Sequence, residues 1–216
     1  MKILAVSDEV VERLYNIQTR ANYPEIRMIL GCGDLSYDYL EFLLTILNAP
    51  LYYVPGNHDP KYSLRPGAFT QGGTNLDGEV VFDRGLLIAG MGGSILYSRA
   101  GYNQYTQAEM FQRAYRLVIK IWMKTFRLRR RLDILITHSP PFGIHDDPED
   151  PAHNGLRALN FILRLAKPRY MLHGHTFFYK RNIREHETIY QQTCVTNVYP
   201  FRVLDISPDQ SPSSQP

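Results

Sequence analysis

The chain has 216 residues, of which 44% are hydrophobic, enough for a substantial core in one large domain or two small ones. Its formal net charge of +3 is too small to predict a nucleic-acid partner, and its two cysteines, Cys32 and Cys194, exclude a disulfide framework and a thiolate zinc cluster. Free cysteines, and the lack of any run of about 18 apolar residues, favour a cytoplasmic protein with no membrane partner.

Hydrophobic periodicity predicts strands and helices that alternate along the chain, which is typical of a layered α/β domain. We expect one folded domain over residues 1–206 and a disordered, Pro/Ser/Gln-rich tail over residues 207–216. In chain order, the predicted strands are 3–6, 28–30, 51–54, 80–82, 86–89, 134–136, 170–172, 193–198 and 201–206. The predicted helices are 11–20, 37–47, 109–130 and 155–166.

Cations are concentrated at the end of the longest predicted helix, where residues 124–131 read K-T-F-R-L-R-R-R. One interpretation is contact with an anionic partner. The other is a solvated helix end, whose cations complement the negative end of the helix dipole.

Polar residues follow the ends of five predicted strands. Ligands of open α/β sheets bind outside the carboxyl ends of the strands, so we expect these side chains to meet at one edge. A single Asp or Asn after a strand is also an ordinary turn or cap residue, and Asp34 alone is explained by a cap on the next helix. Together the set offers the oxygen and nitrogen ligands that suit Mn, Fe or Zn. Its members are Asp8, Asp34, Asn57 with His58 and Asp59, His138, and His175.

Such a set is suited to the hydrolysis of phosphoesters. Two metal ions about 3.5–4 Å apart can activate a water and clamp the phosphoryl oxygens. A carboxylate such as Asp34 has two oxygens and can bridge two ions. Asn57 adds a neutral oxygen, which lowers the negative charge that faces a phosphate.

The ordered set resembles the motifs of the calcineurin-like metallophosphoesterase superfamily, which here read Asp8, Gly33-Asp34, Gly56-Asn57-His58-Asp59, Thr137-His138 and Gly174-His175. The resemblance implies a two-layered β-sandwich flanked by α-helices, with a metal site at the sheet edges. It implies that Asp34 bridges two ions, that Asn57, His138 and His175 complete the shell of one, and that Asp8 serves the other. It also implies that His58 assists the leaving group or stabilises the transition state.

Two positions depart from the superfamily's pattern, because Val10 and Phe177 stand where it usually has histidines. Tyr37 offers a partial replacement, since the stretch 33–37 looks like the Gly-Asp-x-x-Tyr motif of purple acid phosphatases, whose tyrosinate binds a ferric ion. The other interpretation of Tyr37 is an ordinary aromatic at a helix start. Further candidates for contact with metal or substrate are His173, Tyr179 and Arg181.

We therefore expect a metal-dependent phosphoesterase, either a phosphatase or a phosphodiesterase, that hydrolyses a small-molecule phosphomonoester or phosphodiester by attack of a metal-bound hydroxide. Its cofactors would be one or two divalent or trivalent ions of Mn, Fe or Zn per chain. The alternative is a catalytically degenerate scaffold that keeps the fold and binds a protein partner. The loss of two usual ligands favours that alternative.

Overall fold

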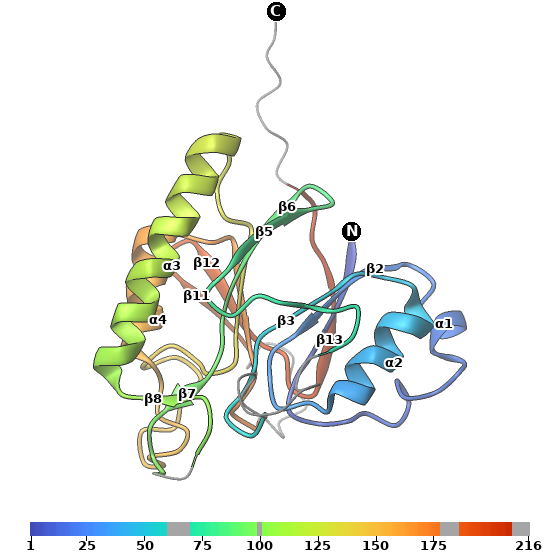
Figure 1. The fold of residues 1–216 in the computed structure, drawn as a ribbon, viewed down its shortest axis with the longest axis horizontal. Coiled ribbons are helices and arrows are strands. Elements are labelled where there is room, and N and C mark those ends of the chain that lie inside the picture. Colours follow the sequence, from blue (N-terminus) through green and yellow to red (C-terminus); the bar gives the residue numbers. More distant parts are fainter. Residues whose placement is uncertain (60–69, 99–100, 178–185, 209–216) are drawn as a thin grey trace, which may run out of the picture.

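The computed structural model describes residues 1–59, 70–98, 101–177 and 186–208, and two β-sheets lie at its centre (Figure 1). The first sheet has the strand order β13 (Phe201–Asp205), β1 (Lys2–Val6), β2 (Ile26–Gly31), β3 (Leu51–Tyr53) and β4 (Thr74–Asn75). The second has the order β11 (Glu187–Tyr190), β12 (Thr193–Asn197), β10 (Tyr170–His173), β9 (Ile134–Thr137), β6 (Leu86–Met91) and β5 (Val80–Asp83). A short parallel pair joins β7 (Ser94–Ile95) to β8 (Gln104–Tyr105).

Helices cover the outer face of each sheet. The first sheet carries α2 (Tyr37–Leu47), with α1 (Thr19–Asn22) beside it, and the second carries α3 (Gln107–Leu128) and α4 (Arg157–Ala166), which run in the same direction (Figure 1). The molecule is therefore layered as helix, sheet, sheet and helix, which confirms the predicted sandwich.

Side-chain alternation along the strands explains this layering. In β1, Ile3 and Ala5 point into the core between the two sheets, while Leu4 and Val6 pack in the cluster beneath α2. Successive strand residues face opposite sides of a sheet, so a strand that is apolar at every position can fill two cores at once. The same strand thus contributes to the inter-sheet core and to the helix layer.

Parallel pairing brings the carboxyl ends of several strands to the same edge. In the first sheet β1, β2 and β3 run parallel, and in the second β6, β9, β10 and β12 do. Loops that leave these ends carry the polar residues singled out in the sequence. The fold therefore gathers them at one edge.

The two ends of the described chain lie together. Strand β13 pairs antiparallel with β1, and the amino group of Met1 donates hydrogen bonds to the Asp205 carboxylate and the Ile206 carbonyl, both at 3.0 Å. The Ile206 amide donates in return to the Met1 carbonyl at 3.0 Å. A late segment of the chain thereby completes the first sheet.

One predicted helix is wrong. Residues 11–18 form turns, and the helix there is limited to Thr19–Asn22. The Thr19 hydroxyl donates to the Leu14 carbonyl at 2.8 Å, a side-chain bond that competes with a regular helical turn.

Of the predicted tail, only residues 207 and 208 lie in the described ranges, so the division into one domain and a tail stays a prediction. No helix in those ranges is both long and apolar enough to cross a bilayer.

Candidate metal centre

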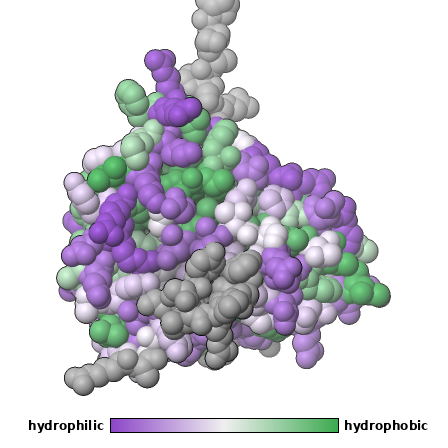
Figure 2. All heavy atoms as spheres, viewed as in Figure 1, coloured by the Kyte–Doolittle hydropathy of each residue, from purple (hydrophilic) through white to green (hydrophobic). Residues whose placement is uncertain are grey.

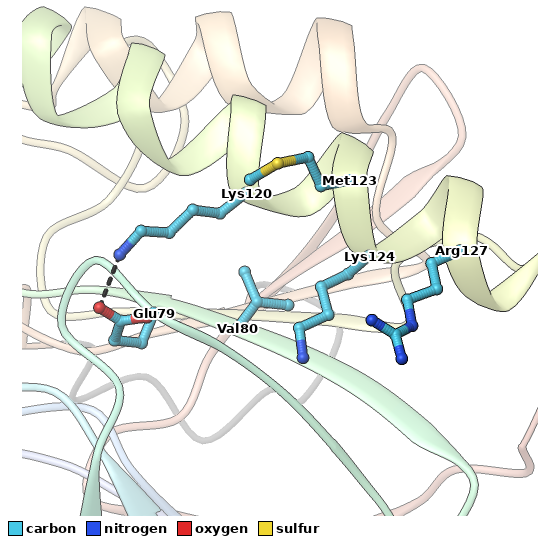
Figure 3. Close-up of a pocket in the computed structure, with 6 residues that line it drawn as sticks. All are labelled: Glu79, Val80, Lys120, Met123, Lys124 and Arg127. Carbon is cyan, nitrogen blue, oxygen red and sulfur yellow. Dashed lines mark hydrogen bonds and ion pairs between the residues drawn. The ribbon is translucent and has the colours of Figure 1, made fainter.

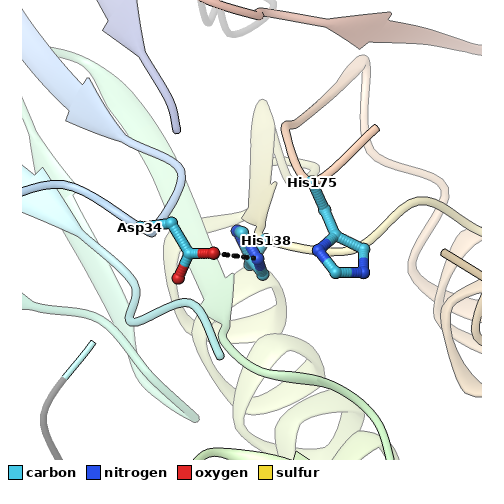
Figure 4. Close-up of side chains that lie close together, drawn as sticks. All are labelled: Asp34, His138 and His175. Atoms are coloured by element: carbon cyan, nitrogen blue, oxygen red, sulfur yellow. Dashed lines mark ion pairs between the residues drawn. The ribbon is translucent and has the colours of Figure 1, made fainter. Parts of the chain in front are cut away.

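Asp34, His138 and His175 meet at the edge shared by the two sheets (Figure 4). Asp34 follows β2, whereas His138 and His175 follow β9 and β10 of the other sheet. One ligand atom from each of the three residues lies within 4.8 Å of the others. The three side chains that the sequence placed after separate strands are thus close enough to share one ion.

His138 presents one ring nitrogen to two oxygen atoms. Its Nδ1 donates to the Cys32 carbonyl at 2.9 Å, and its Nε2 lies 2.9 Å from Asn57 Oδ1 and 3.3 Å from Asp34 Oδ2. With the proton on Nδ1, the unprotonated Nε2 faces two oxygen acceptors, which is unfavourable unless a cation is shared among them. Burial alone would lower the His138 pKa, but the negative charge of Asp34 outweighs the effect of burial and raises the pKa to about 10. In the absence of a metal, His138 is therefore protonated on both ring nitrogens.

His175 has a matching arrangement. Its Nε2 donates to the Ala152 carbonyl at 2.7 Å, which leaves Nδ1 with its lone pair. Burial, followed by the charge of His138, lowers the His175 pKa to about 3, so its ring is neutral and able to bind a metal. Histidines that ligate metals usually have their other ring nitrogen held by a carbonyl or carboxylate, as both histidines do here. The residues present therefore fit a metal ion.

The Asp34 carboxylate is engaged by His58 and His138. Its Oδ1 accepts a hydrogen bond from the His58 amide at 2.8 Å, its Oδ2 faces His138, and the N-cap position of α2 is Ser36, two residues later. Burial would raise the Asp34 pKa, but the nearby His138 charge lowers it to about 2. Asp34 is thus an ionised carboxylate oriented toward the cluster and not a helix cap.

Left-handed backbone conformations place the site residues. Asp8, Asp34 and His175 have φ angles of 64°, 56° and 67°, which non-glycine residues adopt at a cost and which tend to occur at functional sites. Gly33 has a φ of 89°, and a Cβ there would lie 2.6 Å from His138 Nδ1. Only glycine therefore allows the strand end to pass this close to the imidazole.

Asp59 organises the loops around the cluster. Its Oδ2 accepts hydrogen bonds from the amides of Asp34 at 2.8 Å and Gly56 at 2.7 Å, so one carboxylate joins two strand-end loops. Burial, followed by the negative charge of Asp34, raises the Asp59 pKa to about 6. The sequence marked Asp59 only as part of a motif; its contact with Gly56 lies within that motif, whereas its contact with Asp34 joins residues 25 positions apart.

Tyr97 orients the Asn57 amide. Asn57 Nδ2 donates to the Tyr97 hydroxyl at 3.1 Å, which turns Oδ1 toward His138. Sequence reasoning missed Tyr97, because it lies in a loop 40 residues from its partner and carries no motif.

Asp8 lies next to the cluster. Its carboxylate accepts hydrogen bonds from the Ser7 hydroxyl and from the His175 amide, the latter at 2.9 Å. Burial raises the Asp8 pKa although the charge of His138 opposes the shift. These contacts hold Asp8 beside His175.

Tyr37 begins α2 and packs edge-to-face on Tyr53, with the ring centroids 5.9 Å apart. Burial raises its pKa, and Asp59 and Tyr53 raise it further, so the phenol is neutral in the metal-free protein. A tyrosinate ligand would need a strongly acidic ion to displace that proton. The ligand role of Tyr37 stays a prediction.

His173 has both ring nitrogens engaged by neighbours. Its Nδ1 donates to the Gly174 carbonyl at 3.0 Å, and its Nε2 lies 2.9 Å from His145 Nδ1. His173 thus forms a pair with His145 and is not one of the three residues of the Asp34 cluster. The other two candidates, Tyr179 and Arg181, lie outside the described residues.

His153 extends the cluster from an unexpected loop. It lies between β9 and α4, and its ring centroid is 4.9 Å from that of His175 and 5.8 Å from that of Phe177. Asp150 accepts from His153 Nδ1 at 2.6 Å. The only sequence signal for this pair is its place in an acidic loop, which by itself does not distinguish a site residue from a surface residue.

His58 faces a cavity beside the cluster. Its side chain is exposed, while its backbone amide is fixed by Asp34. The cavity has a volume of about 290 Å³ and is lined by Asn57, His58, Tyr97, Ser98, Gly101, Tyr102 and Gln104.

A family model described as calcineurin-like phosphoesterase matches residues 1–178. No protein with a curated description matches the chain.

Among solved structures, one crystal structure is 16% identical, with 91% of this chain and 90% of that chain covered and a TM-score of 0.63. A Vps29 mutant from Entamoeba histolytica is 15% identical, with 91% and 73% covered and a TM-score of 0.43. GAP50, described as the anchor in the inner membrane complex of Plasmodium, is 10% identical, with 91% and 70% covered and a TM-score of 0.46. At these identities the first match supports the fold alone.

Proposed function

Because the chain belongs to the calcineurin-like phosphoesterase family, we propose that it is a metal-dependent phosphoesterase that hydrolyses a phosphomonoester or a phosphodiester. The observation that carries this proposal is the closeness of His138 Nε2 to two oxygen acceptors, Asn57 Oδ1 at 2.9 Å and Asp34 Oδ2 at 3.3 Å. Buried lone pairs gathered in this way need a cation. A phosphoester is a substrate that such a cation can bind and polarise.

Four residues would hold the ion: Asp34, Asn57, His138 and His175. Their mixed oxygen and nitrogen donors suit Mn, Fe or Zn. When bound, the ion would supply a Lewis acid for the phosphoryl group and lower the pKa of a water. Asp8 would serve a second ion, together with Tyr37 if its phenol loses its proton.

His58 would act on the substrate directly. Its imidazole is exposed at the cavity next to Asn57, where it can donate a proton to the leaving-group oxygen or a hydrogen bond to the phosphoryl group. A cavity of about 290 Å³ is at the small end of ligand pockets, which supports a small phosphoester. Tyr97 would keep the Asn57 oxygen turned toward the ion.

Hydrolysis of para-nitrophenyl phosphate and bis-para-nitrophenyl phosphate, with Mn, Fe and Zn added in turn, tests the activity. We expect metal-stimulated turnover that falls about 100-fold or more in Asn57→Ala, because even a partner of a metal ligand is worth 10–100-fold. Gln18→Ala, at an exposed residue away from the site, is the matched control. Equal rates in wild type and Asn57→Ala would overturn the proposal.

Metal content distinguishes an enzyme from a scaffold. We expect at least one transition-metal ion per chain by elemental analysis, lost in His138→Ala. A second ion, with a purple colour after iron loading that Tyr37→Phe abolishes, would assign Tyr37 as its ligand. A chain that purifies without metal, and takes up none on dialysis, would favour the scaffold alternative.

A further inference from the structure

Helix α3 exposes a continuous apolar ridge to solvent. The exposed fractions are 61% for Tyr115, 38% for Ile119, 49% for Trp122 and 88% for Phe126. Phe111, at 38%, extends it by one turn at the start of the helix, and Met123, at 60%, lies beside Trp122. Single exposed apolar residues need no explanation, but six on one helix form a patch of the kind that marks an interaction site. We call these six residues the α3 ridge.

The ridge has the spacing of a helix–helix seam. Its central residues Tyr115, Ile119, Trp122 and Phe126 are separated by four, three and four positions, the spacing of alternating a and d residues in a coiled coil. They span about 16 Å at 1.5 Å per residue. The opposite face of α3 is already buried, since Ala114, Leu117, Val118 and Ile121 pack on the second sheet and α4. The ridge is therefore not the core face of the helix.

Cations border the ridge on one side. Lys120, Lys124 and Arg127 project from α3 and line a cavity of about 200 Å³ with Glu79 and Val80 (Figure 3). Lys120 is paired with Glu79 at 2.6 Å. Within the described part of the chain, Lys124 and Arg127 have no carboxylate at ion-pair distance. Figure 2 shows hydrophilic side chains over much of this helix, with hydrophobic ones among them.

Helix α4 borders the ridge on the other side. Trp122 Nε1 donates to the Leu165 carbonyl at 3.5 Å, and the Phe111 and Phe161 rings are 6.0 Å apart. Arg157 and Arg164 of α4 are exposed and line a cavity of about 300 Å³ with Phe111. The α3 ridge thus lies between the cations of α3 on one side and those of α4 on the other.

The positive charge around the α3 ridge indicates which class of partner fits it. Residues 110–131 contain eight Lys and Arg and no Asp or Glu, so a second copy of α3 would place like charges against each other. The exposed stripe is narrow, because the other apolar face of α3 is packed on the second sheet and α4, and a stripe of this width matches a single helix. Acidic residues at the flanks of such a helix would lie opposite the cations.

We propose that the α3 ridge is a docking surface for an amphipathic helix of a partner protein, with acidic residues on both sides of its apolar seam. Aromatic and Arg side chains of this kind provide most of the binding energy of protein interfaces. None of the ridge residues belongs to the metal centre, so the proposal stands whether or not the chain is an enzyme. It gives the cations of residues 124–131 a role beyond that of a solvated helix end.

Trp122 is the chain's one tryptophan, so intrinsic fluorescence reports on the ridge itself. The probe is a synthetic amphipathic peptide with Leu at heptad positions a and d and Glu at e and g, whose acidic flanks prevent it from pairing with itself. We expect a saturable blue shift of the emission as the peptide covers Trp122. Affinity should fall about tenfold or more in Phe126→Ser and in the double variant Lys124→Glu/Arg127→Glu, as expected for an aromatic hot spot and for charge reversal.

Ile17→Ser is the matched control, because Ile17 is 80% exposed and lies far from α3 in the sequence. Its affinity should equal that of the wild type, and the same peptide with Lys in place of Glu should not bind. The proposal is overturned by an absent shift or by equal binding of both peptides. It is also overturned by a response to anionic lipid vesicles alone, or by emission and sedimentation that change with protein concentration in the manner of self-association.

Discussion

At the scale of single residues, His138 couples the metal centre to pH. Its Nε2 lies between Asn57 Oδ1 and Asp34 Oδ2, and the ring is fully buried. A proton or a metal ion on Nε2 relieves the repulsion between its lone pair and these two oxygens. The two cations therefore compete for the same place, and metal affinity should rise with pH.

The metal-free protein should lose stability as the pH rises from 6.5 toward 10. The folded-state pKa of His138 is about 10, above its ordinary value of 6.5. The stabilisation is therefore complete below pH 6.5 and is lost as the pH rises through the folded-state value. Thermal unfolding in the presence of a chelator would show a falling midpoint over this range.

His138→Gln is the control for that measurement, since other buried groups also titrate at high pH. It should flatten the decline between pH 6.5 and 9, and saturation of the wild type with Zn should do the same. A wild-type midpoint that does not change over this range would contradict the assigned role of His138.

At the scale of elements, α3 begins with a capping box. The Thr106 hydroxyl accepts from the Glu109 amide at 3.2 Å, and the Glu109 carboxylate accepts from the Thr106 amide at 2.7 Å. Each residue satisfies a backbone group that the helix leaves unpaired at its start. This pair fixes where α3 begins, directly after β8.

Thr106→Ala should lower the free energy of unfolding by about 1 kcal/mol, the usual cost of losing such a cap. Urea unfolding measures the change, and Thr106→Ser, which keeps the hydroxyl, should be close to the wild type. Metal content should stay the same in both variants, because the cap touches none of the site residues. A loss of metal in Thr106→Ala would show that α3 also supports the metal centre.

Element types were predictable where the pattern was long. The stripe over residues 37–47 gave α2 with its observed bounds, and Asn48 ends that helix in the left-handed conformation. The two-residue strands β4, β7 and β8 have no period that a sequence can show. The helix expected over residues 11–20 failed because apolar spacing there serves irregular packing, with Leu14 fully buried in a turn.

Some contacts of the candidate site could likewise be predicted from the sequence, and others could not. Asp34, His138 and His175 could be grouped because each follows a strand, and parallel strands end at one edge. The contacts of Tyr97 with Asn57 and of His153 with His175 could not, since they arise from loops whose paths depend on the whole fold. Asp59 is intermediate: its motif was visible, but its two amide partners were not.

At the scale of the whole molecule, the candidate metal centre lies where the two sheets meet. Asp34 and Asn57 follow strands of the first sheet, and His138 and His175 follow strands of the second. Elsewhere the sheets are held together by an apolar core, including Ile3, Leu30, Ile136 and Leu172. An ion at the edge would add a polar bond between the same two layers.

Metal binding should therefore raise the unfolding temperature. At a free ion concentration about 100 times Kd, binding to the folded state alone stabilises by about 2.7 kcal/mol. Thermal unfolding with and without Mn or Zn measures the shift, which Asn57→Ala should reduce. Gln18→Ala should show the full shift, and an equal shift in all three proteins would indicate non-specific binding.

Because β13 pairs with β1, the two ends of the described chain lie close together, and the same fold could form from a chain that begins at another point. The amino group of Met1 lies within hydrogen-bond distance of Asp205 and Ile206, so a short link could close the chain into a ring. A ring opened at the tight turn of Arg84 and Gly85, between β5 and β6, would have new ends at the surface and the same strand neighbours. The architecture depends on which strands lie side by side, and a circular permutant would preserve every one of those adjacencies.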